Sequence, residues 1–161
     1  MKSLVVYDSE FGNTEQVARA IAAVLREAGP SDVRSLSDAT SFAPDIELLI
    51  VGGPTHAHGI DAAFKTFLET LPDTWVNGIE VATFDTRYRM PELVTGSAAH
   101  AIAKRLTRKG AHLLDAPKSF FVEHKEGPLV DGELERAAAW AGDLVASVAK
   151  DRRVGSATES L

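Results

Sequence analysis

The strongest chemical signal in the sequence is a short polar segment near the amino end. Residues 9–14 read Ser-Glu-Phe-Gly-Asn-Thr and contain neither Lys nor Arg. Where such a segment opens a helix, main-chain N–H groups and the partial positive charge of the helix end converge on one point. The segment therefore predicts a site for a phosphate monoester, completed by the Ser9 and Thr14 hydroxyls and the Asn13 amide, with Gly12 allowing close approach of the backbone. The same residues also suit a simple helix cap, with Asn13 or Thr14 as the N-cap.

Two common nucleotide-binding motifs are absent from this segment. It has no Gly-x-x-x-x-Gly-Lys-Ser/Thr, which excludes a Walker-type cradle for a triphosphate. It also lacks Gly-x-Gly-x-x-Gly, the fingerprint of dinucleotide-binding turns. A phosphate bound here would be held by main-chain amides and hydroxyls instead of cationic side chains.

Two later segments also follow apolar runs and carry polar or planar side chains. Residues 52–59 read Gly-Gly-Pro-Thr-His-Ala-His-Gly, and residues 85–96 read Asp-Thr-Arg-Tyr-Arg-Met-Pro-Glu-Leu-Val-Thr-Gly. The His-x-His pair invites a metal-site interpretation, but Asp61 comes one residue too late for metallo-hydrolase spacing and no His follows it. We expect no metal site, and we expect His58 to be exposed in a loop.

These segments are separated by apolar runs that alternate between strand and helix patterns. Leu48–Val51 is aliphatic without polar alternation, which is typical of a strand covered on both faces. The expected strands are 4–7, 33–36, 48–51 and 81–84, followed by one interrupted strand over 112–114 and 120–122. The expected helices are 14–28, 64–71, 98–108 and 134–148. Such alternation predicts a parallel sheet with helices on both faces.

Length and composition limit the classes of protein. The chain has 161 residues and a net charge of −6, which argues against a general nucleic-acid binder. It has no Cys, which excludes disulfides and thiolate-bound metals. No apolar run approaches the roughly 18 residues that a membrane span needs, so we expect a soluble cytoplasmic protein. We expect one domain over 1–149 and a polar tail over 150–161 without regular structure.

Residues 5–14 as a unit resemble the phosphate-binding strand and loop of the flavodoxin family. Residues 52–55, Gly-Gly-Pro-Thr, are similar to the first ring-binding loop of that family, and residues 85–88 fall where its second belongs. Residues 127–136 look like the lead-in to its last helix, and the resemblance extends through most of residues 2–149. It implies an α/β fold with a doubly wound five-stranded parallel sheet in the order 2-1-3-4-5, of the short-chain type. It also implies FMN bound at the carboxyl ends of the strands.

The resemblance assigns residues to the FMN site by position. Main-chain groups of Asp85 and Thr86 would bond the pyrimidine edge of the flavin. His56 would lie over one face of the ring, and Tyr88 is the candidate for stacking on the other face. The complete implied set is Ser9, Glu10, Phe11, Gly12, Asn13, Thr14, Pro54, Thr55, His56, Ala57, Gly59, Asp85, Thr86, Arg87 and Tyr88.

The sequence also departs from the family pattern near the phosphate and the ring. Phe11 stands where the family usually has Thr or Ser, so one hydroxyl toward the phosphate is missing. Arg87 and Arg89 replace the usually acidic surroundings of the ring. Either arginine could pair with Asp85 or Glu92, or could attract an anionic substrate or the phosphates of a nicotinamide cofactor.

Three functions are compatible with these observations. The first is an FMN-binding electron carrier that moves electrons between a reductase and an acceptor protein through transient contacts with redox partners. The second is an FMN-dependent NAD(P)H oxidoreductase of a small substrate such as a quinone. The third is an interaction domain that binds no flavin. The mild net charge of −6 lowers the weight of the carrier, since strong acidity would have favoured it.

Overall fold

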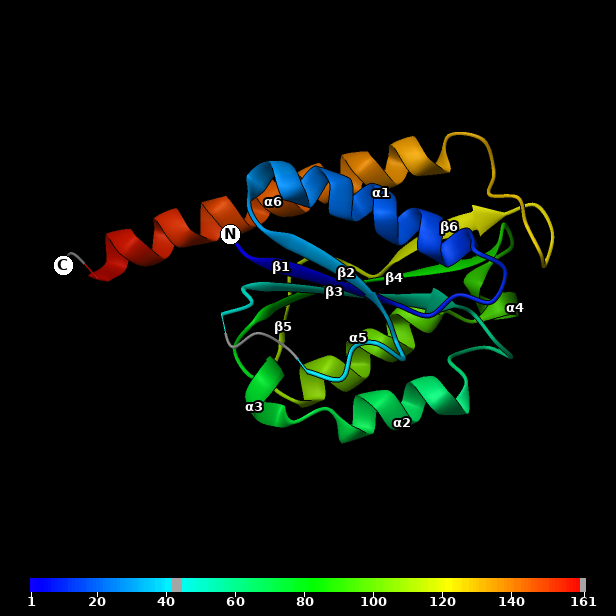
Figure 1. Cartoon of the computed structure of the whole chain (residues 1–161), viewed down its shortest axis with the longest axis horizontal. Coiled ribbons are helices and arrows are strands. Elements are labelled where there is room, and N and C mark those ends of the chain that lie inside the picture. The colour runs from blue at the N-terminus through cyan, green and yellow to red at the C-terminus, as the bar shows by residue number, and fades with distance from the viewer. Residues whose placement is uncertain (42–44, 160–161) are drawn as a thin grey trace.

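The computed structural model describes residues 1–41 and 45–159, in which a parallel sheet lies between two layers of helices (Figure 1). The strands are β1 (Ser3–Tyr7), β2 (Ser31–Ser35), β3 (Leu48–Pro54), β4 (Glu80–Tyr88), β5 (His112–Leu113) and β6 (Lys118–Val122). The helices are α1 (Asn13–Ala28), α2 (Ala62–Thr70), α3 (Asp73–Val76), α4 (Glu92–Thr95), α5 (Ala98–Arg108) and α6 (Glu133–Glu159).

The sheet has the predicted strand order. β1 pairs with β2 on one side and with β3 on the other, and β3 then pairs with β4. β5 pairs with β4 at Glu80 and Val81, whereas β6 pairs with it from Phe84 to Tyr88. Every one of these pairings is parallel. The order 2-1-3-4-5 is thus confirmed, and its fifth position is one interrupted strand in two pieces, as expected.

Two apolar cores hold the helices against the faces of the sheet, as the period-2 alternation of a strand requires. In β1, Val5 and Tyr7 belong to the core under α1 and α6, and Leu4 and Val6 belong to the core with α2 and α5. Figure 1 shows these helix pairs on opposite faces. The aliphatic run of β3 over 48–51 is fully buried, which agrees with a strand covered on both sides. Because helices cover both faces of the sheet, a ligand site can form only at the loops that follow the strand ends.

β4 is longer than its apolar pattern indicates. The expected strand ends at Phe84, but β4 continues to Tyr88 and pairs with β6 over this extension. Residues 85–88 are therefore not a loop, which corrects their assignment as the second ring-binding loop. Side chains from other elements form hydrogen bonds with Asp85, Thr86 and Arg87 of this polar segment, although the Asp85 Oδ1 accepts none within the described residues. The loop that follows β4 begins only after Tyr88.

α6 also extends beyond its predicted end. The tail from Lys150, expected to lack regular structure, is helical to Glu159 and projects from the body of the protein (Figure 1). Its residues are exposed, so packing does not hold it. The helix continues because extension of a helix that is already formed is far easier than nucleation, and this segment contains no proline. Arg152 forms an ion pair with Glu47, which precedes β3.

Candidate functional site

A cavity of about 530 Å³ opens at the carboxyl ends of β1, β3 and β4. It lies where the strand order reverses between β1 and β3, the place where open α/β sheets bind ligands. Of the residues predicted for the site, all line this cavity except Gly12, Gly59 and Asp85. The lining residues are Ser9, Glu10, Phe11, Asn13, Thr14, Pro54, Thr55, His56, Ala57, His58, Thr86, Arg87, Tyr88, Met90, Val94, Thr95, Val122 and Lys125.

The segment between β1 and α1 presents free hydrogen-bond donors to this cavity. The Ser9 Oγ accepts hydrogen bonds from the Gly12 amide at 3.1 Å and from the Glu15 amide at 3.4 Å. The side-chain cap of α1 therefore comes from Ser9 and not from residues 13 or 14. The amides of residues 10, 11, 13 and 14 have no acceptor within the described part of the chain. Unpaired N–H groups at a helix N-terminus suit an anion such as a phosphate.

The side chains of Asn13 and Thr14 connect this segment to two other loops. The Asn13 Nδ2 donates to the carbonyl of Glu126 at 3.2 Å. The Thr14 Oγ1 and the Thr86 Oγ1 share a hydrogen bond of 2.8 Å. Both side chains are thus already used inside the protein, although both residues line the cavity. The main-chain amides are left as the principal donors for an anion.

Gly12 is constrained by the shape of the turn that it occupies. A Cβ added there would meet no protein atom within 4 Å, so packing within the protein does not require glycine. Gly12 instead has a φ of 91°, a left-handed conformation that side chains with a Cβ rarely adopt. The conformation of the turn therefore selects glycine at this position, and close approach of the backbone to a bound phosphate stays a prediction.

The carboxyl of Asp8, at the end of β1, adds negative charge behind this turn. Partial burial and the nearby charge of Asp61 raise the pKa of Asp8 above its ordinary value. The segment between β1 and α1 thus follows directly on a carboxyl group. Binding of an anion beside it would depend on the main-chain amides of this segment and on any cation that lines the cavity.

The loop after β3 folds into a tight turn at the second wall of the cavity. His56 and Gly59 exchange two main-chain hydrogen bonds of 2.7 Å each. Between them Ala57 and His58 have positive φ values of 39° and 73°. His58 is exposed, as predicted, and its backbone bridges to Gly96 of the next loop. His56 is half-buried and lines the cavity, where its planar ring is available to a planar ligand.

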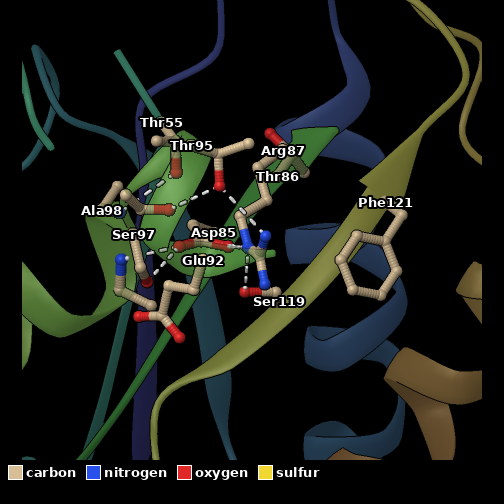
Figure 2. A network of polar contacts seen from close by, with 12 residues as sticks. Thr55, Asp85, Thr86, Arg87, Glu92, Thr95, Ser97, Ala98, Ser119 and Phe121 are labelled. Carbon is tan, nitrogen blue, oxygen red and sulfur yellow. Dashed lines mark hydrogen bonds and ion pairs between the residues drawn. The ribbon is translucent and has the colours of Figure 1, made fainter. Parts of the chain in front are cut away.

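Asp85 lies beneath the cavity instead of lining it. Its side chain is fully buried in β4, and its Oδ2 accepts from the Ser97 Oγ at 2.6 Å and from the Ala99 amide at 3.0 Å (Figure 2). Ser97 is the N-cap of α5. Asp85 and Thr86 pair with β3 and β6 in the sheet, and the expectation that their main-chain groups bond a pyrimidine edge stays a prediction. The carboxylate instead anchors the start of α5.

Arg87 fastens the loop after β4 to the sheet. Its Nε lies 3.9 Å from the Asp85 Oδ1 and donates to the Ser119 Oγ at 2.9 Å (Figure 2). Its Nη1 donates to the carbonyl of Met90 at 2.7 Å and to the Thr95 Oγ1 at 3.1 Å. Only 10% of this side chain is exposed. Of the two roles open to Arg87, the structure favours the pair with Asp85 over attraction of an anionic substrate.

Six lining residues were missed: His58, Met90, Val94, Thr95, Val122 and Lys125. Met90, Val94 and Thr95 follow from the length of β4, which extends the wall of the cavity from residues 86–88 into the loop beyond them. Val122 ends a predicted strand, and its position at the same sheet edge as the other strand ends was available as a signal. Nothing in the local sequence marks Lys125.

Two further observations concern the described part of the chain as a whole. Over residues 1–41 and 45–159, no three His, Cys, Asp or Glu side chains gather where they could hold a metal ion. None of the helices described there combines the length and the apolar character of a membrane-crossing segment.

Comparison with known proteins was made for the sequence and for the fold. A family model described as flavodoxin domain matches residues 4–109. The fold is similar to oxidised flavodoxin 1 from Bacillus cereus, with a TM-score of 0.73, 20% identity and coverage of 90% of this chain and 97% of that one. It is also similar to a flavodoxin from the domain Archaea (TM-score 0.72, 24% identity, 92% and 99%). The flavodiiron protein of Giardia intestinalis matches with a TM-score of 0.72 and 17% identity over 91% of this chain, but only 36% of its own length. No curated protein sequence matched.

Proposed function

The chain belongs to the flavodoxin domain family, and from this premise we propose that it binds FMN and carries electrons between a reductase and an acceptor protein. The observation that carries the proposal concerns residues 10, 11, 13 and 14, which line a cavity at the strand ends and whose amides have no acceptor among the described residues. Four donors at a helix N-terminus fit the phosphate of FMN better than an uncharged ligand.

The other lining residues suit the flavin ring. His56 and Tyr88 come from the loop after β3 and the end of β4, so they offer planar side chains from two walls of the same cavity. Planar side chains give contact area at a small entropic cost. Bound FMN would supply the redox chemistry, while the chain orients it and excludes water from one side.

An apolar rim around the cavity supports contact with a redox partner. Phe11, Tyr88, Met90 and Val94 all line the cavity and are each between 41% and 51% exposed. Leu93 of α4, beside them in sequence, is 96% exposed. An apolar rim at the mouth of a ligand site is typical of surfaces that meet another protein. A carrier requires such a rim, because its partner must come close to the cofactor.

The same rim also suits the second function, an FMN-dependent NAD(P)H oxidoreductase of a small substrate such as a quinone. The two functions differ in the source of electrons. We would load the protein with FMN, mix it anaerobically with NADPH, and follow flavin absorbance with and without a ferredoxin–NADP⁺ reductase. A carrier is reduced rapidly only when the reductase is present. Rapid bleaching of the flavin by NADPH alone would identify the protein as an oxidoreductase. A protein that takes up no FMN would be an interaction domain without flavin.

A further inference from the structure

Lys125 lies in the loop between β6 and α6, lines the cavity, and has no ion-pair partner among the residues that the structure describes. We propose that Lys125 pairs with the phosphate of the bound nucleotide and supplies the positive charge that residues 9–14 lack. The proposal rests on the function proposed above and adds a phosphate-binding residue that no motif of the sequence marks.

The loop that carries Lys125 is closed on itself. Within it, the Glu123 amide donates to the carbonyl of Pro128 at 2.9 Å, and the Gly127 amide donates to the carbonyl of His124 at 3.0 Å. Lys125 lies between these contacts, so its backbone is held in a compact turn at the end of β6.

This turn is joined to the phosphate side of the cavity. The neighbour of Lys125, Glu126, accepts the Asn13 Nδ2 at 3.2 Å through its carbonyl. At Gly127 an added Cβ would lie 2.6 Å from the Asn13 Oδ1, so the two segments approach too closely for a larger residue. Asn13 carries one of the four free amides. The backbone that carries Lys125 is therefore held against the segment that bears the proposed phosphate site.

The charges of the lining residues give Lys125 its role. The lining residues that carry full charges are Glu10, Arg87 and Lys125. The Arg87 guanidinium already donates hydrogen bonds to Ser119, Met90 and Thr95, and it lies beside the Asp85 carboxylate. No hydrogen bond or ion pair engages the Lys125 ammonium within residues 1–41 and 45–159.

A phosphate monoester brings a charge of about −1.5 to −2 at neutral pH. The free amides stabilise this charge but do not neutralise it, and the carboxylate of Glu10, which lines the cavity, opposes it. A flexible exposed ammonium on the adjacent loop can reach an anion that enters the cavity. An ordered ion pair with the phosphate then replaces a solvated lysine.

The test separates the phosphate from the ring by using two flavins. Affinities for FMN and for riboflavin, which lacks the phosphate, are measured by quenching of flavin fluorescence for the wild type, Lys125→Gln and Lys125→Arg. Lys104→Gln, an exposed lysine on α5 outside the cavity lining, is the matched control. We expect Lys125→Gln to weaken FMN binding about tenfold and to leave riboflavin binding unchanged. Lys125→Arg should retain most of the FMN affinity, and Lys104→Gln all of it.

Salt gives a second readout. The affinity of the wild type for FMN should fall with rising salt more steeply than that of Lys125→Gln, because the screened ion pair is missing from the variant. FMN affinity that is insensitive to Lys125→Gln, or equal losses for FMN and riboflavin, would overturn the role of Lys125 and leave the proposed function intact. If the wild type takes up neither flavin, both proposals fall.

Discussion

Replacing Asp85 by Ala tests the polar network that supports the cavity from below. The substitution removes the acceptor of the Ser97 hydroxyl and of the Ala99 amide at the start of α5. It also removes the carboxylate that lies 3.9 Å from the Arg87 Nε, in a site where Asp85 is 0% exposed. A cap and a buried charge partner are therefore lost together.

The expected cost follows from these contacts. Breaking a buried ion pair by removing one partner costs about 3–5 kcal/mol, and a lost helix cap costs about 0.5–2 kcal/mol. These values overlap, since one carboxylate makes both contacts. Arg87 also keeps its hydrogen bonds to Ser119, Met90 and Thr95, which lowers the penalty. We expect Asp85→Ala to lower the free energy of unfolding by about 3 kcal/mol, and Asp85→Asn, which keeps an acceptor, by less than half as much.

The assay is urea unfolding followed by tryptophan fluorescence, which comes from Trp75 and from Trp140, the latter buried against Phe84 and Phe120. Asp143→Ala, at an exposed position of α6, is the matched control and should change the unfolding free energy by no more than about 0.5 kcal/mol. The dependence of the free energy on urea should be the same in all variants. A loss below about 1 kcal/mol for Asp85→Ala would refute the view that this carboxylate is a principal anchor of α5 and Arg87.

Two more predictions concern the ends of helices. Burial raises the pKa of Glu133, but hydrogen bonds from Arg136 and from the Phe121 amide outweigh it and hold this pKa below its ordinary value. The ionised carboxylate thus stabilises the fold above about pH 4.5. Urea unfolding at several pH values should show that Glu133→Gln has a lower free energy of unfolding than the wild type at pH 7. This difference should shrink as the pH falls below about 4. Gly12→Ala should lower the free energy of unfolding by about 1–2 kcal/mol, because the φ of this residue is positive. Gly142→Ala, inside α6, should raise it by about 0.5–1 kcal/mol. Thermal unfolding measures both variants, and equal shifts in the two would contradict this explanation.

The parts of the fold that depend on local patterns were predictable. The aliphatic run of 48–51 identified a strand covered on both faces, and the stripe in α1 identified its packed side. Residues 9–14 could be placed at the cavity because a strand and a helix flank them directly. The wall of the cavity beyond β3 was placed less accurately, since it depends on where β4 ends.

The remaining features arise from contacts between distant elements. The polar pattern of residues 85–88 predicts a loop, yet the segment is strand, and Ser97 and Ser119 form hydrogen bonds with Asp85 and Arg87 there. Lys125 enters the site only because Asn13 holds its loop against α1. The helical tail beyond residue 149 is polar and exposed, so its composition resembled that of a disordered segment. A single sequence does not display any of these pairings.

The binding of a phosphate by the main chain between β1 and α1 is the central claim, and amide NMR tests it most directly. Spectra of the ¹⁵N-labelled protein would be recorded with no ligand, with riboflavin and with FMN. The account predicts that the amides of residues 10, 11, 13 and 14 move downfield with FMN and far less with riboflavin, while amides of the outer part of α6 do not move. Saturation with FMN that leaves those four amides where they were would contradict it.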